Sequence, residues 1–113
     1  MALINMSQGK TIAPTVRVAS TFWRRLKGLL GTDSLPAGQA LIIMPCSAIH
    51  TFGMKYYIDA LFLDKNHRIV KIIDTIKPNR VVTAFGATCV VEVAAGTARQ
   101  LGIVIGDMLQ WDE

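Results

Sequence analysis

The chain has 113 residues, of which 51% are hydrophobic and 18% charged, and its formal net charge is +4. Disordered chains combine few aliphatic residues with a large net charge, so this composition excludes disorder and favours one domain over residues 1–113. The longest strictly apolar run, Ala40 to Met44, is far shorter than the ~20 residues that a membrane-spanning helix needs.

The N-terminal third is predicted to hold one clear helix. Residues 1–14 are polar or mixed, which indicates an arm or an edge strand, and Thr15 to Ala19 alternates apolar and polar residues as a half-buried strand does. Ser20 or Thr21 can cap a helix that Gly31 then ends. We expect its apolar residues to pack into the core because they fall on one helical face. They are Phe22, Trp23, Leu26, Leu29 and Leu30.

Short β-rich runs separated by turn residues fill the rest of the chain. The predicted strands are residues 40–44, 58–63, 68–73, 89–93 and 108–111, the second and third forming a hairpin. Thr97 is expected to cap a short helical turn that ends at Gly102. The pattern therefore predicts a mainly β fold, a small single-domain β-sandwich or barrel-like structure. One packed N-terminal helix and a short helical turn near the C-terminus complete it.

Unusual residues are concentrated between Cys46 and Asp59. A metal site is one interpretation, because Cys46 and His50 are ligand types. Zinc needs three or four ligands, and Pro45 argues against a helix that would align these two. We therefore expect no metal and no other cofactor.

A nucleophilic pair is a second interpretation of the same segment. Cys46 would act as the thiolate, His50 as the base and Asp59 as the orienting group, which would make the chain a cysteine/histidine-dependent hydrolase or transferase. Cysteine is also among the most buried residue types, so Cys46 can equally be a core residue. Catalytic residues are not assigned beyond these three candidates.

Ligand recognition is a third interpretation, and it depends on two carboxylates in apolar strands. Asp59 shares a strand face with Leu61, and Glu92 shares one with Val90. Buried carboxylates cost free energy unless they are paired or solvated. A structural ion pair or backbone hydrogen bonds would explain them. Alternatively, Asp59 and Glu92 converge with His50 on a polar pocket.

Four motifs resemble the prokaryotic domain of unknown function 192 family. They are residues 25–31 (RLKGLLG), residues 46–64 (CxxIHTxxMxxxIDxxFLD), residues 91–96 (VEVxAG) and Gly106-Asp107. The resemblance implies a compact, mainly β, sandwich-like domain with one packed helix, and it implies no reaction. The positions that it marks are Arg25, Gly28, His50, Met54, Asp59, Glu92, Gly96 and Asp107. Cys46 together with His50 matches only one branch of the family.

These observations favour a small binding module with a polar cleft near the Cys46–Asp59 segment. Its ligand would be a small molecule or a peptide, or a protein partner would bind there. The candidate ligand-binding residues are His50, Met54, Asp59, Glu92 and Arg25. Weak nucleic-acid association ranks last, because the only dense basic group is Arg24, Arg25 and Lys27, with Arg17 nearby.

The chain start and the two cysteines bear on the compartment. The first residues have neither the positive segment nor the apolar segment of a signal peptide, and two cysteines make no disulfide framework. We therefore expect a cytoplasmic protein with no membrane span, as a monomer or a homodimer.

Overall fold

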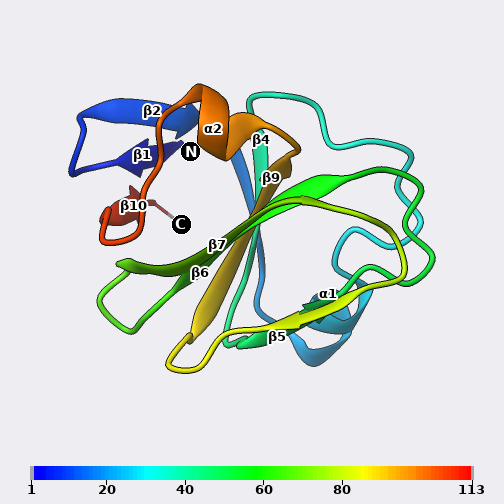
Figure 1. Ribbon diagram of the computed structural model, residues 1–113. Helices are drawn as coiled ribbons and strands as arrows, with labels where there is room; N and C mark the ends of the chain where they lie inside the picture. The colour runs from blue at the N-terminus through cyan, green and yellow to red at the C-terminus, as the bar shows by residue number, and fades with distance from the viewer. Residues whose placement is uncertain (1, 113) are drawn as a thin grey trace.

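A five-stranded sheet forms the centre of the computed structural model, which describes residues 2–112 (Figure 1). Its strand order is β3-β4-β9-β6-β7, with β3 and β4 parallel and the other neighbours antiparallel. The strands are β3 (Thr15–Ala19), β4 (Gln39–Ile43), β9 (Cys89–Ala94), β6 (Ile58–Leu63) and β7 (Ile69–Ile76).

Two smaller sheets and two short helices surround this sheet. The three-stranded sheet has the order β10-β1-β2, and β5 pairs with β8 in a separate ribbon. These elements are β1 (Leu3–Asn5), β2 (Lys10–Ala13), β5 (Ala48–His50), β8 (Val81–Thr83) and β10 (Leu109–Trp111), with helices α1 (Phe22–Lys27) and α2 (Thr97–Gln100). In Figure 1 the three-stranded sheet and α2 lie at one end of the view, and α1 and β5 lie together at the other.

Both faces of the central sheet are covered, so its middle strands are apolar throughout. All six residues of β6 are buried. Alternate residues of β6 contribute to two separate cores, as the two-residue period of a strand requires. Leu61 and Leu63 pack with the three-stranded sheet and α2, whereas Ala60 and Phe62 pack with Leu29 and the β5 side.

The predicted mainly β fold is confirmed, whereas closure into a barrel is not, since the sheets remain separate. The hairpin is present as β6 and β7. Within residues 1–14, β2 is an edge strand of its sheet, whereas β1 is not. β1 is the middle strand of its sheet, between β10 and β2, and Leu3 is fully buried. No helix among residues 2–112 is long and apolar enough to cross a membrane.

The first helix is shorter and less buried than expected. Thr21 caps α1 by accepting a hydrogen bond from the Arg24 amide, but the helix ends at Gly28, where φ is +49°. Leu29 and Leu30 therefore leave the helical face, and only Leu29 of the two is buried. The expected core position of Trp23 is wrong, since this side chain is 74% exposed. The Phe22 side chain lies outside the described part of the chain.

Two other apolar residues of the first helix and the start of the second helix also differ from expectation. Leu26 and Leu30 were expected in the core and are instead 55% and 41% exposed. At the second helix the N-cap residue is Gly96, with φ of +89°, and Thr97 is the first helical residue. A helix of six residues is less than two turns long, so its position depends on its neighbours more than on its own pattern.

Candidate functional site: a pocket between α1, β5 and β9

A pocket of about 270 Å³ opens beside α1. We call it the Glu92 pocket. Its walls are residues 25–30 of α1 and the following turn, residues between Ile43 and Met54, and Glu92 of β9. The pocket combines apolar walls with a few polar groups, as small-molecule sites do.

Glu92 lies at the inner wall of this pocket and is only 4% exposed. Its neighbours across the sheet are Leu41 of β4 and Ala60 of β6, so neither adjacent strand supplies a polar partner at that position. Within residues 2–112, Oε1 of Glu92 has no hydrogen-bond partner. Burial raises the pKa of this carboxyl from 4.5 to about 7.

Arg25 of α1 supplies a second polar group without a partner. Its Nη1 donates a hydrogen bond to the Pro45 carbonyl at 3.1 Å, which holds the guanidinium against the pocket wall. Its buried Nε–H has no acceptor in the described part of the chain. The ion pairs of residues 2–112 do not include one between Arg25 and Glu92. Within residues 2–112, the lining of the pocket therefore includes a donor and an acceptor without partners.

Gly28 allows α1 to end close to Glu92. Its φ of +49° is a conformation that favours glycine, and a Cβ built there would lie 3.9 Å from Oε1 of Glu92. The same Cβ would lie 3.7 Å from Cδ1 of Ile43. Glycine thus ends the helix and keeps the space beside the carboxyl free of a side chain.

The remaining polar residues of the pocket come from the segment between β4 and β6. Cys46 is half-buried, its Sγ donates to the Ala48 carbonyl at 3.0 Å, and burial raises the pKa of its thiol. His50 is exposed and its ring stacks on Phe52 with centroids 5.5 Å apart. Met54 is half-buried beside them.

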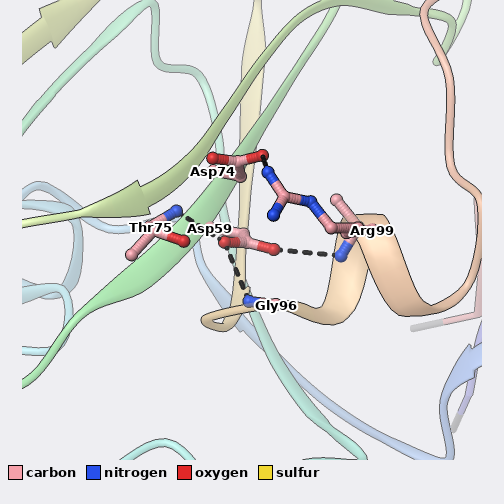
Figure 2. Close-up of polar contacts among 6 residues, drawn as sticks. Asp59, Asp74, Thr75, Gly96 and Arg99 are labelled. Carbon is pink, nitrogen blue, oxygen red and sulfur yellow. Dashed lines mark hydrogen bonds and ion pairs between the residues drawn. The ribbon is translucent and has the colours of Figure 1, made fainter.

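Asp59 lies elsewhere, in a network of backbone hydrogen bonds (Figure 2). Its carboxylate accepts from the amides of Thr75 at 2.8 Å, Gly96 at 3.2 Å and Ala98 at 2.9 Å. These donors connect β7 and the start of α2 to β6. The structural explanation, backbone hydrogen bonds, therefore accounts for Asp59, and the expected convergence of Asp59 with His50 and Glu92 is not found.

The pocket thus holds four of the five residues expected to bind a ligand: Arg25, His50, Met54 and Glu92. Of the catalytic candidates, Cys46 and His50 line it, whereas Asp59 is held on the other face of the sheet. The part of the chain that the structure describes contains no group of three or more His, Cys, Asp or Glu side chains suited to a metal ion.

The apolar side of the pocket was not expected from the sequence. Leu26 and Leu30 were assigned to the core, and Phe52 was assigned no role, yet all three line the pocket and are partly exposed. The signal was Gly28, which interrupts the helical pattern between Leu26 and Leu30. Asp107 of the family motifs is likewise structural: it accepts hydrogen bonds from Asn5, Gln8 and Val104.

Comparison with known proteins matches residues 3–111 to the model of DUF192, described as an uncharacterized ACR. The chain belongs to the DUF192 family. The resemblance seen in the four sequence motifs is therefore confirmed. The match covers the central sheet, both helices and every residue of the Glu92 pocket.

Relatives of this DUF192 chain share most of its length. A UPF0127 protein of Thermococcus sibiricus is 33% identical over 97% of this chain and 74% of its own. A UPF0127 protein of Pyrococcus furiosus is 29% identical over 97% of both chains. A solved structure, a protein of unknown function from Novosphingobium aromaticivorans, has the same fold. Its TM-score is 0.84 at 24% identity, over 97% of this chain and 82% of that one.

Proposed function

We propose that this DUF192 chain is a small binding module whose ligand site is the Glu92 pocket. The observation that carries the proposal is the carboxyl of Glu92, 4% exposed, without a hydrogen-bond partner for Oε1 in residues 2–112, and placed in a pocket wall. A buried polar atom without a partner costs about 1–3 kcal/mol. A ligand that pairs with Oε1 would recover this free energy on binding.

Two further features support a ligand site rather than a packing defect. Arg25 lines the same pocket, and its buried Nε–H also lacks a partner within residues 2–112. Native proteins leave only a few buried polar groups unpaired. Gly28 also keeps the space beside Oε1 open, since a Cβ at that position would lie 3.9 Å away.

The size and lining of the pocket favour a small organic molecule. A volume of about 270 Å³ is just below the usual range for small-molecule sites, about 300–1,000 Å³, so the ligand should be small. Leu26, Leu30 and Phe52 are exposed by 55%, 41% and 50%, and they would cover the apolar part of a bound molecule. Peptide binding remains a second form of the same proposal, in which one side chain enters the pocket.

The hydrolase or transferase alternative has weaker support. Burial raises the pKa of the Cys46 thiol, and a nucleophilic cysteine needs a lowered one. Asp59, its expected orienting residue, is occupied by three backbone amides. For nucleic-acid association, Arg25 donates to the Pro45 carbonyl and lines the pocket with Lys27, which leaves the exposed Arg24 outside the pocket lining.

A fragment panel monitored by two-dimensional amide NMR tests the binding proposal. We expect a subset of fragments to shift the amide signals of Gly28, Ala48 and Phe52 together, since these residues line the pocket. Ala48→Phe enlarges an exposed lining residue and should abolish the shifts. Ile105→Phe, at a 65% exposed position outside the pocket, is the matched control and should retain them. Shifts that never cluster at the pocket, across the whole panel, would refute the proposal.

A further inference from the structure

The charges that line the Glu92 pocket are unequal. Arg25 and Lys27 are two cations, whereas Glu92 is the only carboxylate among the lining residues. Burial disfavours the charged form of Glu92, so this acid offsets only part of the positive charge near neutral pH. The pocket therefore favours an anion over a cation, in a chain whose net charge is itself +4.

Hydrogen-bonding capacity narrows the choice of anion. Arg25 Nε–H can only donate. When Glu92 is protonated, its carboxyl O–H is also a donor and can bind an acceptor atom of a ligand. Two donors that line one pocket suit a group with two acceptor oxygens. A carboxylate is such a group, and the apolar side of the pocket at Leu26, Leu30 and Phe52 suits an attached hydrocarbon or ring.

We propose that the ligand of the Glu92 pocket is a small carboxylic acid in its anionic form, with one oxygen bound by Arg25 Nε–H and the other by the O–H of Glu92. This inference rests on the proposed binding function and specifies its ligand class. When Glu92 is ionised before binding, the complex takes up one proton from solvent. That proton lies on Glu92 and is shared with the ligand oxygen, and no covalent bond forms or breaks.

The other groups that face Glu92 do not supply this proton. Leu41 and Ala60 lie opposite it on the adjacent strands and do not ionise. Arg25 and Lys27 of α1 are cations, and burial raises the pKa of Cys46 further above neutrality. His50 is the remaining imidazole of the lining. The test therefore separates Glu92 from His50.

Three probes of one shape and different head-group charge identify the ligand class: phenylacetate, phenylacetamide and phenethylamine. Each is titrated into the full chain between pH 6 and 8.5, and binding is read from the amide signals of Gly28 and Ala48. We expect phenylacetate to bind at least ~10-fold tighter than the other two at pH 6. Its affinity should fall about tenfold per pH unit above pH 7, because one proton is taken up.

Variants assign the proton to a residue. Glu92→Gln places a permanent N–H donor in the pocket, so phenylacetate should bind with little pH dependence between pH 6 and 8.5. His50→Gln should keep the slope of the wild type, and Arg25→Met should weaken binding of phenylacetate at least ~10-fold at every pH. Glu92→Gln keeps the size of the side chain, and His50→Gln changes it little. The NMR spectrum of each variant checks that it folds.

Several results would overturn the carboxylate inference while leaving the binding module intact. The first is binding of phenylacetamide or phenethylamine that is as tight as that of phenylacetate, or tighter. The second is a pH dependence of phenylacetate affinity that disappears in His50→Gln instead of Glu92→Gln. The third is failure of all three probes to bind when other fragments of the panel occupy the pocket. Failure of the entire panel to reach the pocket would refute the proposed function itself.

Discussion

Asp59 and Glu92 lie on neighbouring strands one residue out of register, and their side chains point to opposite faces of the central sheet. The register pairs Asp59 with Val93 and Ala60 with Glu92, so the two acids alternate across the pleat. Asp59 is held by three amides from β7 and the start of α2, whereas Glu92 faces α1 and the pocket. One acid is held by backbone amides, and the other lines the pocket.

Replacing Asp59 should destabilise the fold. Asp59→Ala leaves the amides of Thr75, Gly96 and Ala98 without their acceptor, and we expect a loss of about 3–5 kcal/mol in the free energy of unfolding. Urea denaturation measures the loss. Asp74→Asn is the control: its ion pair with Arg99 is exposed, so the change should stay within ~0.5 kcal/mol. Equal effects of the two substitutions would contradict the structural role of Asp59.

Glu92 should make the stability fall as the pH rises. Its folded pKa of about 7 lies above the ordinary value of 4.5, so the folded state binds more protons than the unfolded state between these values. Stability is therefore highest below pH 4.5, as far as this group is concerned, and decreases as the pH rises through 7. The total loss is about 3 kcal/mol.

The comparison with Glu92→Gln isolates this contribution. The variant lacks the titrating group, so the difference in unfolding free energy between variant and wild type should grow in favour of the variant from pH 5 to 8. Urea denaturation at each pH, with both proteins in the same buffers, provides the measurement. A constant difference across this range would show that Glu92 ionises normally.

Gly53 should control the mouth of the pocket through Leu30. A Cβ at Gly53 would lie 2.8 Å from Cδ1 of Leu30, so Gly53→Ala must displace this lining side chain. Gly86 has a similar φ, +82° against +78°, but no atom lies within 4 Å of its built Cβ. Both alanine variants should lose about 1–2 kcal/mol of stability from backbone strain. Only Gly53→Ala should change the affinity of fragments that bind in the pocket, and an equal effect of Gly86→Ala would argue against the contact.

The cysteines should react slowly. Burial raises the pKa of the Cys46 thiol and raises that of Cys89 to about 12, so alkylation by iodoacetamide at pH 8 should be slower than for an exposed cysteine. Mass spectrometry of the peptides separates the two sites. We expect Cys46 to label first, more slowly still when a fragment occupies the pocket, and Cys89 to label only on unfolding. Rapid labelling of Cys46 with an apparent pKa well below 8.5 would instead support the hydrolase or transferase alternative.

The sequence predicted the elements whose signals are local. The hairpin of β6 and β7 follows from two β-rich runs around a turn, and the strand faces of Asp59 and Glu92 follow from the two-residue period. Four of the five residues of the predicted ligand set line one pocket, but their meeting depends on how α1 and β5 pack beside β9 and not on local signals.

Features that depend on long-range pairing could not be predicted in this way. The central position of β1 depends on its pairing with β10, about a hundred residues away. The exposure of Trp23 and Leu26 depends on α1 ending at Gly28, since a longer helix would have turned its apolar face to the sheet. The separation of Asp59 from the pocket required the register of β6 against β9, which the faces of the individual strands do not reveal.

A crystal structure of this DUF192 chain with the highest-affinity fragment of the panel tests the central claim most directly. The account predicts density for the fragment in the pocket between α1 and β9, with a polar atom within hydrogen-bonding distance of the Glu92 carboxyl and a second near Arg25 Nε. Density for the bound fragment at another surface, with Glu92 and Arg25 still without partners, would contradict it.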